Sequence, residues 1–237
     1  MPPALLADLK LEPAVTGLPM QFAMPDEAAF RESLKLLDEN AAFAAAIGCH
    51  RMMAVMSPGS QTPKDERRKF VKDRLLAISE VLQRSNIRLG LEFLGPLYMR
   101  TGERSPYQFI YRLDETVALA KECGPNIGVV LDAWHWFHSG GTTADILDAG
   151  KSRIVHIHVS DAKPAPAEEV RDNQRFMPGE GVIDLIGFFQ ALKKIGYEDG
   201  VSPEPLGRIP AEMTAEEGAQ LGLETTVAVM KKAGAIA

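Results

Sequence analysis

The chain has 237 residues, of which 46% are hydrophobic, and its formal net charge is −6 at pH 7. This length suffices for one α/β barrel-sized domain or two small domains, and no apolar run approaches the ~20 residues that a membrane-spanning helix needs. No block of lysines and arginines would follow a phosphate backbone, which disfavours nucleic-acid binding through a basic face.

Cysteine usage and the first residues point to a compartment. Cys49 and Cys123 lie in separate segments and fit reduced thiols, as expected of a cytoplasmic protein. The opening residues, MPPALLADLKLEP, have no basic region followed by an apolar one, so we expect no secretory signal. No linker-like stretch of Pro, Gly or Ser divides the chain. We therefore expect one cytoplasmic domain over residues 1–237.

Strand-like and helix-like patterns alternate along the chain. The expected strands are 14–22, 49–56, 87–93, 127–131, 154–159 and 200–204. The expected helices are the tail of a helix at 2–12, a helix opening at Pro25-Asp26-Glu27 and ending before Gly48, and helices at 65–85, 107–123, 142–147, 184–195 and 215–232. A long polar loop is expected at 162–181. The run IGVVL at 127–131 is typical of a strand buried on both faces.

This order is a strand–helix unit repeated six times. Regular alternation implies parallel strands joined by right-handed crossovers, and a closed (β/α) TIM-type barrel is the natural architecture. Such a barrel has eight units, so the first two are missing from the expected pattern and the domain is expected to be N-terminally shortened. An uncovered barrel would expose two edge strands, which makes a homo-oligomer one expectation.

Four of the expected strands end in a group that binds divalent cations. The residues are Glu92, Asp132, His158 and Glu204. Because the carboxyl ends of parallel barrel strands open on one face, these side chains should converge. Three carboxylates and one imidazole suit Mn²⁺, Mg²⁺, Co²⁺ or Zn²⁺ and do not suit a metal that prefers thiolates.

Each of these residues also has an ordinary interpretation. Glu92 could pair with a loop arginine, Glu204 and Asp132 could cap the turns that follow them, and His158 could be a satisfied core histidine. His156 alternates with His158 and so lies on the same side of the strand, where it fits a deeper hydrogen-bonding position. The coincidence of four such residues at equivalent strand ends favours the metal site.

The segment after Asp132 is rich in rings. His135 lies one helical turn beyond Asp132 and can face the site without binding the metal, where it would hydrogen-bond a substrate oxygen; a surface histidine is the alternative. Trp134, Trp136 and His138 fit loop packing or a pocket wall better than chemistry.

Several motifs together resemble one family. LGLEFLGP, VVLDAWHW, VHIHVSDA, RFMPGEGVID and GYEDGVSPEP are similar to the sugar phosphate isomerase/epimerase proteins of the xylose isomerase-like TIM barrel superfamily, from about Leu9 to the C-terminus. The resemblance implies metal ligands at Glu92, Asp132, His158 and Glu204. It also implies substrate contacts at His135 and at Arg175, although an ion pair of Arg175 with Glu180 or Asp172 remains an alternative.

The implied activity is a metal-dependent sugar isomerase or epimerase. A 2-keto sugar or related polyol would bind one divalent cation, which stabilises the enediolate formed when a C–H proton leaves. Glu92 and Glu204 would act as paired acid and base. Return of the proton to the opposite face of the same carbon gives epimerisation, return to the neighbouring carbon gives isomerisation, and loss of a β-hydroxyl gives dehydration.

Two departures from the family pattern leave alternatives open. The ketose 3-epimerases carry another glutamate where this chain reads FLGPLYMR, and the first two βα units are not visible. A dehydratase like inosose dehydratase and a non-catalytic remnant of the family are therefore alternatives. A nuclease like endonuclease IV is disfavoured, because it would need more metal ligands and a basic groove, whereas this chain has five histidines and a negative net charge.

Overall fold

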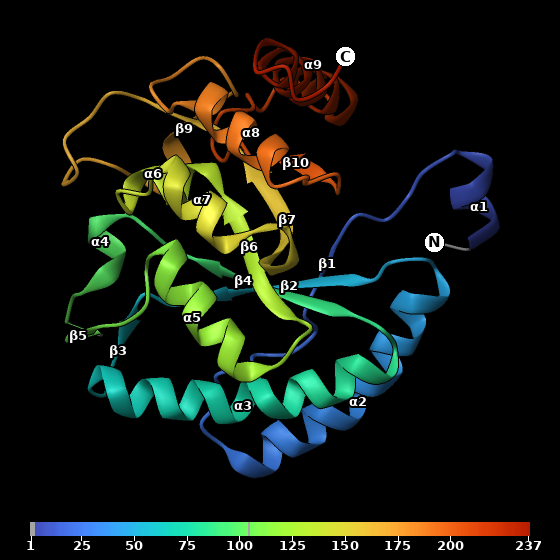
Figure 1. Cartoon of the computed structure of the whole chain (residues 1–237), viewed down its shortest axis with the longest axis vertical. Coiled ribbons are helices and arrows are strands. Elements are labelled where there is room, and N and C mark those ends of the chain that lie inside the picture. Colours follow the sequence, from blue (N-terminus) through green and yellow to red (C-terminus); the bar gives the residue numbers. More distant parts are fainter. Residues whose placement is uncertain (1–2, 104) are drawn as a thin grey trace.

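A computed structural model describes residues 3–103 and 105–237 and shows a six-stranded parallel sheet with helices on its outer face (Figure 1). The strand order is β1-β2-β4-β6-β7-β10, and each neighbouring pair is parallel. The bounds are β1 Thr16–Gly17, β2 Arg51–Met56, β4 Arg88–Phe93, β6 Ile127–Asp132, β7 Ile154–Val159 and β10 Val201–Pro203. The predicted α/β class and order of parallel strands are confirmed.

Helices join the strands and bury their apolar faces against the sheet. They are α1 Pro3–Asp8, α2 Glu27–Ala46, α3 Lys64–Arg84, α4 Leu97–Arg100, α5 Leu113–Cys123, α6 Ala133–His138, α7 Thr143–Ala149, α8 Leu185–Lys194 and α9 Ala215–Lys232. Side-chain caps fix where several begin: Asp26 accepts from the amide of Ala29, and Thr142 and Thr214 form capping boxes. Because helices cover them, β4, β6 and β7 are almost wholly buried.

The sheet curls into a half-barrel and stays open. In the described chain β1 and β10 are its two edges and do not pair with each other. They approach each other near their amino ends, where a Cβ placed on Gly200 would lie 3.0 Å from that of Ala14. An ion pair between Arg51 and Asp199 spans the same end. The two edges are therefore in contact at the amino end of the sheet.

Some predicted elements differ from the structure because tertiary contacts and proline override local pattern. The helix expected at 107–123 begins at Leu113; Tyr107–Gln108 forms β5, antiparallel to β3 (Gly59–Ser60), and Phe109 beyond it is fully buried. The strand expected at 14–22 has only two residues, and Pro19 beyond it lacks the amide hydrogen a ladder needs. The helix expected at 2–12 covers Pro3–Asp8, and residue 2 lies outside the described residues.

The segment expected as a loop at 162–181 is partly ordered by a small hairpin. Here β8 (Asp161–Ala162) pairs antiparallel with β9 (Arg175–Phe176), and a short 3₁₀ turn at Asp172–Gln174 precedes β9. This hairpin brings Arg175 back beside the end of β7.

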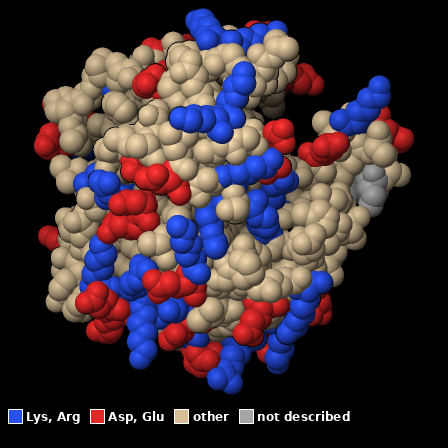
Figure 2. Space-filling model, in the orientation of Figure 1, with Lys and Arg blue, Asp and Glu red and all other residues tan. Residues whose placement is uncertain are grey.

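The surface and helices set two further limits. Among the described residues, no helix is both long and apolar enough to cross a membrane. Acidic and basic side chains are interspersed on the face seen in Figure 2, where no continuous basic stripe forms.

Candidate metal and substrate site

The four predicted ligands meet at the carboxyl end of the sheet. Glu92 lies in β4, Asp132 ends β6, His158 lies in β7, and Glu204 directly follows β10. Each offers one ligand atom, and these atoms all lie within 4.8 Å of one another. The strand register explains the meeting, because Asp132 and Ser202 are both aligned with His158.

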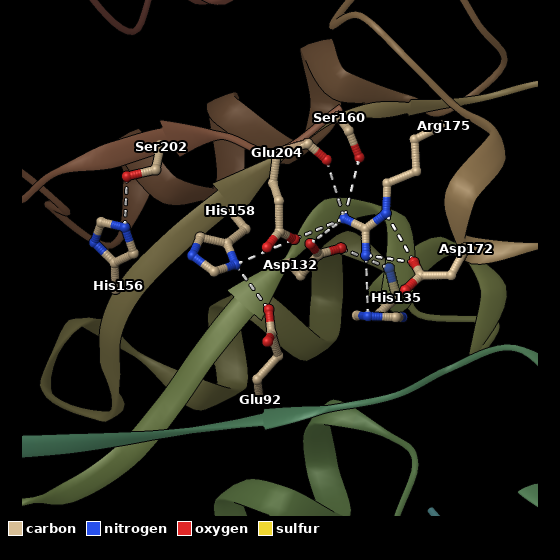
Figure 3. Close-up of polar contacts among 10 residues, drawn as sticks. All are labelled: Glu92, Asp132, His135, His156, His158, Ser160, Asp172, Arg175, Ser202 and Glu204. Atoms are coloured by element: carbon tan, nitrogen blue, oxygen red, sulfur yellow. Dashed lines mark hydrogen bonds and ion pairs between the residues drawn. The ribbon is translucent and has the colours of Figure 1, made fainter. Parts of the chain in front are cut away.

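His158 lies between the two glutamates (Figure 3). Its Nδ1 is 2.8 Å from Oε1 of Glu92 and 3.5 Å from Oε2 of Glu204. Burial raises the pKa of Glu92 and outweighs the hydrogen bond from His158 that lowers it. Burial acts to lower the pKa of His158, but its hydrogen bonds to Glu204 and Glu92 outweigh burial and raise that pKa. The cluster therefore attracts positive charge strongly.

Arg175 is the second cationic group of the cluster. Its Nη1 donates to Oδ2 of Asp132 at 2.7 Å and to Oε2 of Glu204 at 2.9 Å, and its Nη2 donates to Oδ1 of Asp172 at 2.7 Å. The side chain is only 1% exposed and lies over the ring of Trp134. The ion pair with Asp172 is thus present in the structure, whereas Glu180 pairs with Arg208.

Asp132 uses its two oxygens differently. Oδ1 accepts from the amide of His135 at 2.8 Å and caps α6, while Oδ2 accepts from Arg175. Burial acts to raise its pKa, but the charge of Arg175 and the neighbouring imidazoles outweigh burial and hold the pKa well below its usual range. The helix-cap interpretation of Asp132 and its place in the cluster are therefore both correct.

Three further histidines, His135, His138 and His156, occupy distinct positions. His135 is buried, with Nε2 3.2 Å from Nη2 of Arg175 and no partner for Nδ1 among the described residues. His156 lies deeper, and its Nε2 is 2.9 Å from Oγ of Ser202, as its position on the strand predicts. His138 packs edge-on against Trp134, and Trp136 packs against Phe188. The structure thus brings His135 to the cluster and leaves His138 in packing.

The donor set fits a hard or borderline divalent cation. Three carboxylates and an imidazole on separate strand ends form a compact, mostly buried group, and oxygen with nitrogen donors suits Mn²⁺, Mg²⁺, Co²⁺ or Zn²⁺. In this structure, Arg175 and His158 supply the positive charge that these carboxylates need.

The sequence interpretation missed Asp161, which organises the loop beside Arg175. This buried carboxylate accepts backbone hydrogen bonds at 2.8–3.0 Å from four amides, those of Ala162, Gly179, Gly181 and Ile183. Gly181 is required there, because a Cβ on it would lie 2.3 Å from the carbonyl oxygen of Ala162. The motif PGEG after a polar strand end was the available signal.

Comparisons with known proteins agree with this geometry. An inosose isomerase of Bacillus subtilis is 31% identical over 169 residues, which cover 71% of this chain and 58% of that protein. The chain therefore spans little more than half of that relative's length. An inosose isomerase of Bacillus velezensis is 26% identical over 94% of this chain and 77% of its own.

Solved structures show the same fold. A xylose isomerase domain protein from Alicyclobacillus acidocaldarius superposes with a TM-score of 0.88 at 27% identity, over 98% of this chain and 82% of that one. The IolI protein, solved with a bound zinc atom, has a TM-score of 0.80 at 26% identity, over 97% and 81%. The model of the xylose isomerase-like TIM barrel matches residues 4–226. As its motifs predicted, this chain belongs to the xylose isomerase-like TIM barrel family.

Proposed function

We propose that the chain is a divalent-metal-dependent isomerase or epimerase of a small keto-sugar or related polyol. The observation that carries this proposal is the meeting of Glu92, Asp132, His158 and Glu204 within 4.8 Å at the open end of the sheet. Two kinds of relative support it: the inosose isomerases, and the IolI structure that holds zinc. The proposed site residues are these four as ligands, with His135 and Arg175 as substrate contacts.

A bound divalent cation would polarise the substrate carbonyl and acidify the neighbouring C–H group. In Figure 3 Glu204 lies above and Glu92 below Nδ1 of His158, and one of these carboxylates would remove a proton while the other returns it. The Glu92 side chain is 5% exposed and that of Glu204 is 31% exposed. Glu204 is therefore the more accessible of the two to water, and Arg175 and His135 are the proposed contacts for substrate oxygens.

A dehydratase is the second candidate. An inosose dehydratase of Geobacillus thermodenitrificans is 29% identical over 126 residues. The same proton removal followed by departure of a β-hydroxyl would dehydrate the substrate, with an acid group protonating the leaving oxygen. Product analysis separates the two reactions, because only dehydration releases water and forms a C=C or a deoxy ketone.

Cysteine chemistry supports a cytoplasmic location for this single domain. Cys49 and Cys123 are buried free thiols, as expected in a reducing compartment. The sheet has two unpaired edges, β1 and β10, through which two copies of the chain could associate. Sedimentation would measure whether the chain forms a homo-oligomer.

Metal binding tests the proposal most directly. We expect one divalent ion per chain, and a stabilisation of about 2.7 kcal/mol when free metal is 100 times its Kd. Glu204→Gln should abolish this stabilisation, while the matched control Glu180→Gln should keep it because Glu180 contacts Arg208 outside the cluster. The unaltered protein and Glu180→Gln should both incorporate solvent deuterium into a keto-sugar, and Glu204→Gln should not. Failure to bind Mn²⁺, Mg²⁺, Co²⁺ and Zn²⁺ would overturn the proposal and favour a non-catalytic relative.

A further inference from the structure

Among the described residues, one arginine at the carboxyl end of the sheet has no side-chain hydrogen-bond or ion-pair partner. Every other arginine in the described residues donates through its side chain to a carboxylate or a carbonyl oxygen. Arg67 makes no such bond; its Nε is buried without a partner, and its only ring contact is Phe70, 5.4 Å from the guanidinium carbon. Its guanidinium thus keeps its full set of donors free.

An unpaired cation of this kind is unfavourable for the free protein. Arg67 is half-buried, and this desolvation lowers its pKa. Burying charge without a hydrogen-bond partner costs free energy, and in the described chain only the Phe70 ring, 5.4 Å from the guanidinium carbon, offsets part of that cost. A planar guanidinium with free donors is suited to bidentate binding of phosphate or carboxylate. An external anion would supply the missing partner.

Arg67 stands between two adjoining cavities at the carboxyl end of β2. The first has a volume of about 480 Å³ and is lined by Met53, Val55 and the loop after β1. The second, of about 420 Å³, is lined by hydroxyl side chains, including Ser60 and Thr62. Both cavities share Arg67, so its side chain joins them into one groove.

The groove begins beside the proposed metal site. Val55 is aligned with Glu92 in the neighbouring strand, so both side chains lie on the same face of the sheet, and parallel strands lie about 4.8 Å apart. Val55 is 51% exposed although it faces the inside of the half-barrel. A ligand held at the cluster can therefore extend over Val55 toward Arg67.

The second cavity presents hydrogen-bond donors. Oγ of Ser60 and Oγ1 of Thr62 are 3.4 Å apart, and the amide of Thr62 donates to Oγ of Ser60 at 3.0 Å. The two hydroxyls share one hydrogen between them, which leaves the other O–H free to donate. The acidic side chain that lines this cavity is Glu66, which is exposed to water and screened there. The lining thus favours an anion over a cation.

We propose that Arg67, with the hydroxyls of Ser60 and Thr62, binds an anionic group at the far end of the substrate. The group is a phosphate or a carboxylate, so the substrate is a sugar phosphate or a sugar acid whose carbonyl end lies at the Glu92–Glu204 cluster. The proposal rests on the proposed isomerase or epimerase function and specifies its substrate class.

Titration with inorganic phosphate and with acetate, at constant ionic strength and with EDTA present, tests the anion site. Melting temperatures would be followed for the unaltered protein, for Arg67→Gln and for the matched control Arg68→Gln, whose arginine pairs with Glu122 on the same helix. We expect Arg67→Gln to weaken anion binding about tenfold or more and Arg68→Gln to change it less than twofold. Tighter phosphate binding identifies a sugar phosphate, and tighter acetate binding a sugar acid.

Three results would overturn the anion site: no binding of either anion, equal binding by Arg67→Gln, or equal weakening by both variants. Glu204→Gln separates this inference from the proposed function, because it should lose metal binding and keep anion binding. If the protein binds an anion and no metal, the proposed isomerase function is refuted and the anion site is not. If the protein binds metal and no anion, the anion site is refuted and the proposed isomerase function is not. A melting temperature for Arg67→Gln no lower than that of the unaltered protein shows that it folds.

Discussion

Arg175 and Arg67 lie at the same open end of the sheet, and they are satisfied in opposite ways. Arg175 is 1% exposed and contacts Asp132, Glu204 and Asp172 (Figure 3). Arg67 is half-buried and contacts no acidic group in the part of the chain that the structure describes. The charges around Arg175 are therefore neutralised within the chain, while Arg67 is a cation without a partner among the described residues.

The difference follows from the elements that carry each side. The strands β4, β6 and β7 are six residues long and covered by helices, so they can hold charged groups in fixed positions. On the other side β1 has two residues and β2 exposes Val55 toward the open interior. The charged network thus lies where the sheet is covered by helices, and Arg67 lies beside the edge of the sheet where Val55 is exposed.

The largest effect should come from breaking the charged network around Arg175. Asp132→Ala leaves Arg175 buried with fewer partners and removes the cap of α6, so the free energy of unfolding should fall by about 3–5 kcal/mol. Urea unfolding in EDTA measures it. Asp114→Ala, which removes the exposed pair with Arg112, should change stability by less than about 1 kcal/mol. A loss as small for Asp132→Ala would show that the network contributes little.

An intermediate effect should come from the loop anchor. In the structure, Oδ2 of Asp161 accepts from the amides of Gly179 and Gly181. Asp161→Asn places either an NH₂ group or a neutral, weaker acceptor at that position, so the free energy of unfolding should fall by about 2 kcal/mol. Limited proteolysis should then cut near residues 179–183 more rapidly. The exposed control Asp148→Asn should behave like the unaltered protein. Unchanged cutting would mean that the loop does not depend on Asp161.

The smallest effect should come from replacing Arg67. Arg67→Gln removes a cation that none of the described residues pairs with, so the free energy of unfolding should stay within about 0.5 kcal/mol or rise. Chemical denaturation without added anions measures this change. A loss above about 2 kcal/mol would show that Arg67 stabilises the fold, and the contrast between the two arginines would not hold.

The sequence predicted the elements whose pattern is strong. Residues 154–159 form the predicted strand, and residues 215–232 form the predicted helix, because an apolar run and an amphipathic, capped repeat each favour one structure. The meeting of Glu92 with Glu204 also followed from pattern, since parallel strands align their carboxyl ends. What failed was the helix expected at 107–123, whose first residues are held by contacts with a distant turn at Pro58.

Other parts of the site could not be read from pattern. The helix α6 begins at Asp132, and one residue there serves both as a cap and as a member of the cluster. Asp161 bonds to amides about twenty residues further along the chain, which no local periodicity encodes. That Arg67 has no ion-pair partner among residues 3–103 and 105–237 depends on how distant segments pack, which a sequence does not show.

The all-parallel strand order has a consequence for how the protein reaches this state. Each pairing in the sheet joins strands separated by at least one helix, so contacts are non-local and chain folding should be slow. Glu204 follows β10, which pairs with β7 through only three residues. Docking of β10 therefore completes the cluster, and a chain in which β10 is undocked would hold the helix-covered strands β4, β6 and β7 without a complete cluster.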